Sequence, residues 1–309
     1  MSVLLERVRE QVRSVVVGQE EALGQLVAAL VCRGHVLIEG PPGVAKTLMA
    51  RALAQALGLD FARAQFTPDM LPSDLTGTMI LRGGELTFRP GPVFTNLLLA
   101  DEINRTPPKT QAALLEAMQE GQVTVDGRGH ALPTPFLVLA TQNPVEYEGT
   151  YPLPEAQLDR FLLRIELGYP SAEDERVLLG LERRGLTPTA LEHIRPVAGA
   201  QELAAAGDEV DATAVSEEVL AYVVALIRRT RELPSVSLGA SPRAAVHLLT
   251  AARAMAWLAQ RSFVTPDDVA TIAPAVLAHR LVLTPEAELE RYTAREAIGT
   301  VIDEVPVPR

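Results

Sequence analysis

The sequence predicts an α/β domain, in which helices flank a parallel sheet with hairpin insertions, followed by an all-α domain. Two patterns predict this class. Between Gly34 and Tyr169, apolar segments alternate with amphipathic helical segments, as in a parallel sheet with helical crossovers. After the turn signal Gly168-Tyr169-Pro170, only helical spacing continues. The 309 residues suffice for two domains, and we expect them at residues 1–168 and 169–309.

The expected strands and hairpins all lie in the first domain. Four apolar segments predict the strands of the sheet: residues 35–39, 96–100, 136–141 and 161–167. Two further segments predict hairpins, because a strong turn dipeptide stands at the centre of each. They are 79–88, around Gly83-Gly84, and 122–132, around Asp126-Gly127.

Helix signals stand between and after these segments. In the first domain we expect a helix over 48–57, closed by Gly58, and another over 107–120, capped by Thr106.

In the second domain, Ser171 and Thr265 each precede an Asp by three residues and are expected to open helices. Residues 185–212 are rich in Pro, Gly and Ala and predict a loose connection before a helix over 217–230.

Composition and charge exclude several classes of function. Hydrophobic residues make up 48% and charged residues 22%, which excludes disorder as a description of the whole chain. The 28 basic and 39 acidic residues give a net charge of −11, and the acidic excess is similar in both expected domains. Nucleic-acid binders normally present an electropositive face and rings for stacking, yet aromatic residues are only 4%. We therefore expect no nucleic-acid partner.

Cysteine content and the N-terminal segment predict the compartment. Cys32 is the single cysteine, so it cannot form an intramolecular disulfide, and the scattered histidines predict no zinc cluster. Charged residues within the first ten positions argue against a signal peptide, and no uncharged stretch reaches the roughly 20 apolar residues of a membrane span. A cytoplasmic protein without a membrane span is expected.

A phosphate-binding pattern follows the first expected strand. It is the run Gly40-Pro41-Pro42-Gly43-Val44-Ala45-Lys46-Thr47, continued by Leu48 in the next helix. In such a P-loop, backbone N–H groups hold phosphates, Lys46 reaches the β- and γ-phosphates and Thr47 binds Mg²⁺. The alternative is a Gly-Pro turn that binds nothing. Of the 28 basic residues 26 are arginines, so a lysine at position 46 favours the P-loop, where a guanidinium would not fit.

Ala45 departs from the general P-loop pattern, which has glycine at this position. Its methyl group disfavours positive φ. We therefore expect Ala45 to have a helical conformation.

Polar residues follow two later strands. Asp101 and Glu102 end an apolar segment, as in a Walker B motif, in which Asp101 would hold Mg²⁺ through water and Glu102 would polarise the attacking water. An acidic pair that caps the next helix is the alternative. Asn143 follows another strand and is a candidate to orient water, or else an ordinary turn residue.

These motifs together resemble the AAA+ ATPases, and longer runs resemble the MoxR branch of that family. The runs are 100–105 (ADEINR), 107–111 (PPKTQ), 140–144 (ATQNP), 148–161 (EGTYPLPEAQLDRF) and 239–244 (GASPRA). The resemblance covers nearly the whole chain, and Ala45 is similar to what this branch shows.

The resemblance implies roles for further residues. Asn143 matches sensor 1. Arg243 matches sensor 2, a cation that the lid offers to the γ-phosphate, and Ser241 and Pro242 would place it in the first turn of a helix.

Arg160 matches the arginine finger, which acts in the neighbouring subunit's site of a ring. A surface ion pair with Asp159 or Glu155 is the alternative for this residue. The segment Val17-Gly18-Gln19-Glu20 resembles the adenine side of the nucleotide site, and the two hairpins resemble the insertions of the helix-2-insert clade.

The resemblance implies an ATP- and Mg²⁺-dependent ATPase with a helical lid that assembles as a ring homo-oligomer, expected to be a hexamer. Such proteins remodel or activate a protein client or enzyme complex in a chaperone-like manner, often with a von Willebrand A domain partner. One alternative is a nucleic-acid-associated AAA+ motor, which the acidic charge disfavours. The other is a nucleotide-gated scaffold with little turnover, which the presence of Glu102, Asn143 and Arg160 together disfavours.

Overall fold

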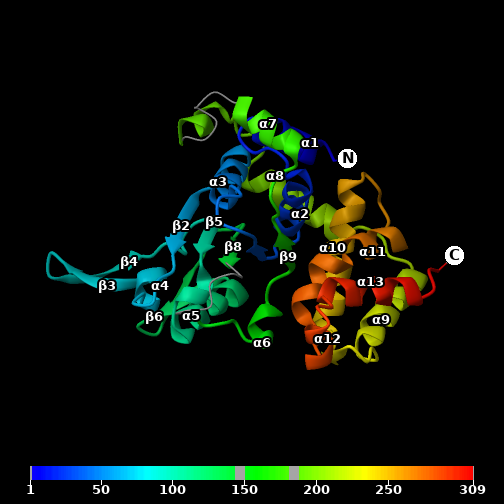
Figure 1. Ribbon diagram of the computed structural model, residues 1–309. Coiled ribbons are helices and arrows are strands. Elements are labelled where there is room, and N and C mark those ends of the chain that lie inside the picture. Colours follow the sequence, from blue (N-terminus) through cyan, green and yellow to red (C-terminus); the bar gives the residue numbers. More distant parts are fainter. Residues whose placement is uncertain (1, 143–149, 181–187, 309) are drawn as a thin grey trace. The chain divides into compact units, whose positions relative to one another are not determined.

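The computed structural model describes residues 2–142, 150–180 and 188–308. The chain forms two compact units, and most of their elements are labelled in Figure 1. The sheet unit comprises Val3–Leu153 and Ile165–Ala204, and the helical unit comprises Pro154–Arg164 and Ala205–Arg309 with Met1–Ser2. The domain boundary expected between residues 168 and 169 stays a prediction. In the division into compact units, Ile165–Ala204 belongs to the same unit as the sheet.

A five-stranded sheet in the order β2-β5-β8-β1-β9 organises the sheet unit. Its strands are β1 (Val36–Glu39), β2 (Phe61–Gln65), β5 (Leu97–Asp101), β8 (Leu137–Gln142) and β9 (Leu163–Glu166). The pairs β2·β5, β5·β8 and β8·β1 are parallel. The apolar residues of β1, β5 and β8 are almost fully buried, as expected for parallel strands with both faces covered. The four predicted strands and the fold class are confirmed.

The sheet unit also contains helices, among which the helix over Lys46–Ala56 packs on β2 and β5. They are α1 (Val3–Val12), α2 (Glu20–Val31), α3 (Lys46–Ala56), α4 (Pro72–Thr76), α5 (Pro108–Glu120) and α7 (Ala172–Gly180), with short 3₁₀ turns η1 (Ile103–Arg105) and η3 (Pro188–His193).

The ends of α3 and α5 test the helix signals of the sequence. Gly58 follows α3 with φ 59°, as predicted for a closing glycine, and Gly121 ends α5 in the same way with φ 60°. Thr106 was the wrong cap, because Pro107 occupies the N-cap with φ −57° and ψ 152° and α5 begins at Pro108. The residue before a proline is kept out of the helical region, so Pro108 holds Pro107 in the extended N-cap conformation and is itself the first helical residue.

Both predicted hairpins are confirmed. They are β3 (Gly77–Arg82) with β4 (Glu85–Pro90), and β6 (Gln122–Val125) with β7 (Arg128–Ala131). The β3–β4 hairpin extends away from the sheet in Figure 1. At its base, the ring of Phe88 stacks on His130 of the other hairpin with 3.9 Å between ring centroids, so the two insertions pack on each other.

The helical unit contains α6 (Glu155–Leu158), α9 (Glu217–Thr230), α10 (Pro242–Leu258), α11 (Pro266–Leu277), η4 (Ala278–Arg280), α12 (Pro285–Leu289) and α13 (Ala294–Glu304). The predicted helix 217–230 is confirmed as α9. Thr265 and Asp268 form the predicted capping box of α11, and Ser171 and Asp174 exchange the corresponding hydrogen bonds before α7.

Two expectations for the second half of the chain are wrong in detail. Residues 185–212 are not a loose connection throughout, because α8 (Ala200–Asp211) forms within them. This helix has four alanines, and alanine is the strongest helix former rather than a loop residue. Strands also do not cease after Tyr169, since β10 (Val236–Leu238) pairs antiparallel with β11 (Val282–Leu283) beside the helices.

Candidate active site

The loop between β1 and α3 has the backbone of a phosphate cradle. A Cβ at Gly40 would lie 2.4 Å from the carbonyl oxygen of Leu167, so only glycine fits there. Gly43 has φ 87°, and a Cβ there would meet nothing within 4 Å, so this side of the loop is open. The Lys46 ammonium donates to the carbonyl of Gly40 at 2.7 Å, across the loop. Glycine-rich backbone, an open face and the start of a helix are the features with which proteins bind phosphate groups.

Lys46 lies close to carboxylates as well as to the loop. Burial lowers the pKa of its ammonium below the ordinary value, and three carboxylates oppose this shift: those of Asp101, Glu102 and Glu39. The Lys46 ammonium and the two acids at the end of β5 therefore share one electrostatic environment.

The expectation for Ala45 is wrong. Ala45 is the N-cap of α3 with φ 62° and ψ 23°, the left-handed region, and its carbonyl accepts the hydrogen bond of the Met49 N–H. This conformation costs a residue with a Cβ roughly 1–2 kcal/mol. It reverses the chain between Gly43 and Lys46, so that the first turn of α3 faces the loop.

Both oxygens of the Asp101 carboxylate are hydrogen-bonded. Oδ2 accepts from Arg63 of β2, with Nη2 at 2.7 Å and Nε at 3.1 Å, and Oδ1 accepts from the Thr141 hydroxyl of β8 at 2.5 Å. The strand order β2-β5-β8 explains this arrangement, because β5 lies between the two strands that hold its last residue. Asp101 is thus fixed from both sides at the carboxyl edge of the sheet.

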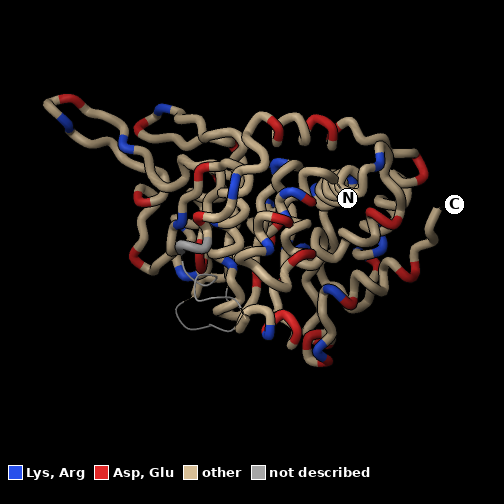
Figure 2. Tube along the Cα trace, turned by 90° about the horizontal axis from the view of Figure 1, so that it is seen from above, with Lys and Arg blue, Asp and Glu red and all other residues tan. Residues whose placement is uncertain are grey.

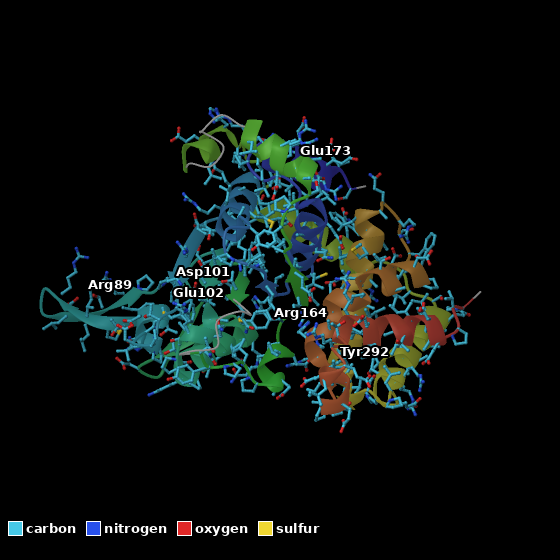
Figure 3. All side chains as sticks on the ribbon, in the orientation of Figure 1. Arg89, Asp101, Glu102, Arg164, Glu173 and Tyr292 are labelled. Atoms are coloured by element: carbon cyan, nitrogen blue, oxygen red, sulfur yellow. The ribbon has the colours of Figure 1, made fainter. Side chains whose placement is uncertain are left out.

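Glu102 is held by its backbone and by its carboxylate. It has φ 58° and ψ 49°, and its N–H donates to the Thr141 hydroxyl at 2.9 Å. Its Oε2 accepts from Gln65 at 2.8 Å and lies 3.2 Å from Nε of Arg105. Left-handed backbone at a residue with a long side chain is uncommon and concentrates at functional sites. Figure 3 shows Asp101 and Glu102 next to each other.

Three residues that hold these acids were missed in the sequence: Arg63, Gln65 and Thr141. Arg63 and Gln65 alternate along β2, which was not predicted because Phe-Ala-Arg-Ala-Gln lacks the apolar run of a buried strand. Thr141 lies within a predicted strand, and its position one residue past the end of the apolar run was the available signal. It is almost fully buried, and its hydroxyl bonds both Asp101 and Glu102.

The segment before α2 lines a surface cavity of about 750 Å³. Its lining includes Val17, Gly18, Arg13, Asp174 and Val177. Gly18 has φ 75°, and a Cβ there would lie 2.7 Å from Asp174 Oδ2. Gln19, the N-cap of α2, donates from Nε2 to the carbonyl of Gly168 at 3.2 Å. The predicted adenine-side segment thus packs on the start of α7 at a hollow of the sheet unit.

Other predicted site residues belong elsewhere. Arg160 follows α6 and Arg243 lies in the first turn of α10, so both belong to the helical unit. Ser241 caps α10 by accepting from the Ala244 N–H at 3.2 Å, as its sequence predicts. Asn143 lies outside the described residues. Within the described chain Arg160 makes no ion pair, and the Asp159 carboxylate binds Arg280 instead.

Comparison with known proteins gives the family. The model of the "ATPase family associated with various cellular activities (AAA)" matches residues 35–163, and the "AAA lid domain" matches residues 228–301. Chaperone MoxR1 of Mycobacterium tuberculosis is 44% identical over 319 residues, 99% of this chain and 82% of that protein. The chain belongs to the MoxR family of AAA+ ATPases.

Two other proteins have the same extent as this MoxR-family chain. YeaC of Bacillus subtilis is 48% identical over 307 residues, which cover 99% of this chain and 95% of that protein. A crystal structure from Cytophaga hutchinsonii has a TM-score of 0.91 and 42% identity, with 99% of this chain and 95% of that chain covered. The MoxR-type sheet and lid therefore extend over the full length compared.

Acidic and basic residues are interspersed along both units of this MoxR-family protein, and the described residues contain no long stretch of basic residues (Figure 2). Along the described residues, no helix combines the length and the apolar character that crossing a membrane requires.

Proposed function

We propose that this MoxR-family protein binds ATP with Mg²⁺ and hydrolyses it. The observation that supports this most is the pair Asp101 and Glu102, fixed at the carboxyl edge of the sheet beside Lys46. A protein that only bound nucleotide would need no carboxylate placed to activate water. In our proposal Glu102 accepts the proton of the attacking water, and general bases of this kind contribute about 10²- to 10⁴-fold in rate.

The residues of the site fit Mg²⁺ and the phosphates. Mg²⁺ commonly binds one or two protein oxygens, several waters and the phosphates of its nucleotide. The Thr47 hydroxyl is an oxygen donor of this kind, and the Asp101 carboxylate, which already accepts from Arg63 and Thr141, would hold the ion through its waters. The bound ion would neutralise charge on the phosphates. The phosphates themselves would lie in the loop formed by Gly40, Pro42, Gly43, Val44, Ala45, Lys46, Thr47 and Leu48, with Val17, Gly18 and Gln19 on the adenine side.

Three more residues complete the proposed chemistry. Asn143 would orient the water as sensor 1, and Arg243 would contact the γ-phosphate as sensor 2. Arg160 would act as the arginine finger of the neighbouring subunit's site and stabilise the charge that builds on the transferring phosphoryl group. A site completed by a neighbour requires a subunit interface, a repeated head-to-tail interface can close as a ring, and we propose a homo-oligomeric ring, a hexamer.

The work of the ring would be the remodelling or activation of a protein client or enzyme complex in the cytoplasm, with a von Willebrand A domain protein as one proposed partner. The name of the relative Chaperone MoxR1 supports a chaperone-like role. The net charge of −11 supports a protein client over a nucleic acid.

Mixing two inactive variants tests this proposal. Lys46→Ala should lose nucleotide from its own site, whereas Arg160→Ala should keep nucleotide and lose turnover. In a mixed ring, a Lys46→Ala subunit still lends Arg160 to a neighbour with an intact Lys46, so the mixture should recover part of the ATPase activity. If both variants assemble and exchange subunits but the mixture stays inactive at every ratio, Arg160 does not act in a neighbour's site. Salt-sensitive stimulation by DNA would instead support the nucleic-acid motor.

A further inference from the structure

Arg280 is a buried arginine in the short turn η4 of the helical unit. Its side chain is 2% exposed. Its Nε donates to Asp159 Oδ1 at 2.7 Å, and the rest of the guanidinium donates to main-chain carbonyls. These are the carbonyls of Asp159 at 3.3 Å, Phe161 at 2.6 Å, Leu162 at 3.3 Å and Val276. One guanidinium thus bonds three carbonyls and one carboxylate of the segment 159–162.

These contacts flank Arg160 on both sides in the chain. The carbonyls of Asp159 and Phe161 belong to its two neighbours. His279, next to Arg280, also donates from Nε2 to the Phe161 carbonyl at 3.1 Å. The Arg160 side chain itself has no ion pair within the described chain. Arg280 and His279 thus hold the backbone on either side of Arg160.

Two further groups complete the surroundings of Arg280. His247 of α10 accepts a hydrogen bond from the guanidinium through Nδ1. Burial, with Arg280 second, lowers the pKa of His247 to about 4, so its imidazole is neutral and can accept. Asp159 Oδ2 accepts from Ser241, which caps α10, at 3.1 Å. The buried guanidinium of Arg280 thus has one counter-ion, and each of its three nitrogens donates a hydrogen bond.

We propose that Arg280 is a positioning residue for Arg160, acting with Asp159 as its counter-ion. The proposal rests on the role of Arg160 in a neighbour's site given above. A buried ion pair adds little to stability compared with apolar residues of similar volume, so its presence calls for a purpose other than packing. A planar guanidinium can bond several fixed carbonyls at once, whereas a lysine ammonium cannot match that geometry. Arg280 is therefore suited to hold the 159–162 segment in one conformation.

The test places Arg280→Lys in one partner of the mixed ring at a time. The donor is the subunit that keeps Arg160 and lends it to its neighbour's site. A donor with Lys46→Ala and Arg280→Lys is mixed with an acceptor that has Arg160→Ala, so every working site depends on an Arg160 whose backbone contacts are altered. Misplacement of a catalytic group by about 1 Å can cost 10²-fold in rate. We expect the restored ATPase activity to fall by about that factor relative to the mixture of Lys46→Ala with Arg160→Ala.

In the acceptor, Arg160→Ala/Arg280→Lys is mixed with Lys46→Ala. The acceptor has no finger of its own, so restored activity should stay within about twofold of the simple mixture. A merely structural role would reduce activity equally in donor and acceptor. Equal loss in both positions, or no loss in either, would overturn the proposal.

A matched control is the pair Arg261 and Asp268 of the same unit. Arg261 donates to Asp268 with Nη1 to Oδ2 at 2.7 Å, far along the chain from Arg160. Arg261→Lys in the donor should leave restored activity unchanged, and a loss like that of Arg280→Lys would also count against the proposal.

If Arg280→Lys does not fold, as judged by circular dichroism and nucleotide binding, Asp159→Asn takes its place in both positions with the same expectations. Failure of the simple mixture of Lys46→Ala with Arg160→Ala would instead refute the proposed function of Arg160, and with it the role of Arg280. The two failures are thus distinct.

Discussion

Ala45 and Glu102 are two residues of the candidate active site with left-handed backbone, at φ 62° and 58°. Both stand at the start of a turn or helix that follows a strand of the sheet, Ala45 before α3 and Glu102 before η1. In each case the strained residue lets the next element begin facing the edge where β1, β5 and β8 end. The strain is thus stored where the chain must reverse beside the site.

Glycine at position 45 should relieve that strain. Ala45→Gly removes roughly 1–2 kcal/mol of left-handed strain, and the greater freedom of glycine in the unfolded chain takes back about 0.4–1 kcal/mol. We expect the free energy of unfolding in urea to stay equal or to rise by up to about 1.5 kcal/mol. Ala221→Gly, at an exposed position inside α9, should instead lose about 1 kcal/mol. Equal losses for the two variants would contradict the left-handed conformation of Ala45.

His35 predicts a pH dependence of stability. Its Nδ1 accepts from the Val138 N–H at 3.0 Å and its Nε2 contacts the Met118 carbonyl at 3.1 Å, so the ring is neutral. Burial lowers its pKa from 6.5 to about 4. Above pH 6.5 the His35 imidazole is neutral in both the folded and the unfolded protein. Between pH 6.5 and 4 it binds a proton in the unfolded chain but stays neutral in the folded protein. Stability should therefore fall by about 1.4 kcal/mol per pH unit from this group between pH 6.5 and 4.

The measurement is the free energy of unfolding at several pH values across that range. His35→Gln should be less stable at neutral pH but show a shallower pH slope than the unaltered protein. His193→Gln, at an exposed position, should leave the slope as it is. A slope that His35→Gln does not change would show that His35 is not the buried neutral group described here.

At the scale of elements, the site depends on three adjacent strands. β2 and β8 lie on either side of β5, and Thr141 of β8 is the residue that bonds both acids at its end. Its hydroxyl must donate to Asp101 and accept from the Glu102 N–H at the same time, which only a hydroxyl can do among side chains of this size.

Thr141→Val keeps the shape of the side chain and removes both hydrogen bonds. A hydrogen bond to a charged group is worth about 1.5–3 kcal/mol, so we expect turnover at saturating ATP to fall by about 10- to 100-fold. Thr141→Ser keeps the hydroxyl and should retain most of the activity. Nucleotide affinity measured alongside separates this effect from lost binding. Equal activities of the Val and Ser variants would show that the hydrogen bonds of the Thr141 hydroxyl are not needed for turnover.

Sequence patterns were strong for some elements and weak for others. The central strands are uninterrupted apolar runs, and the hairpins have turn dipeptides, so both could be predicted. The edge strand β2 and the alanine-rich α8 lack such signals, and a five-residue strand with Arg63 and Gln65 is defined only by its pairing with β5. Ala45 also escaped prediction, because an intrinsic backbone preference was overridden by the fold of the loop.

Across the whole chain, the sequence motifs predicted the candidate site residues but not the residues from distant segments that hydrogen-bond to them. Asp101 and Glu102 follow from the end of an apolar strand, whereas Arg63 and Thr141 reach them from strands that are 38 and 40 residues away in sequence. Arg280 is likewise 121 residues from Asp159, to which it binds. Contacts between distant segments depend on strand order and helix packing, which cannot be predicted directly from a single sequence.

We propose above that Glu102 activates the water that attacks ATP. Parallel measurement of ATP binding and steady-state turnover in Glu102→Gln tests this role, with Glu116→Gln, at an exposed position of α5, as the matched control. We expect Glu102→Gln to bind ATP with nearly unchanged affinity, to hold it uncleaved and to turn over about 10²- to 10⁴-fold more slowly, while Glu116→Gln should behave like the unaltered protein. Turnover of Glu102→Gln at the unaltered rate would contradict the role of Glu102 as general base.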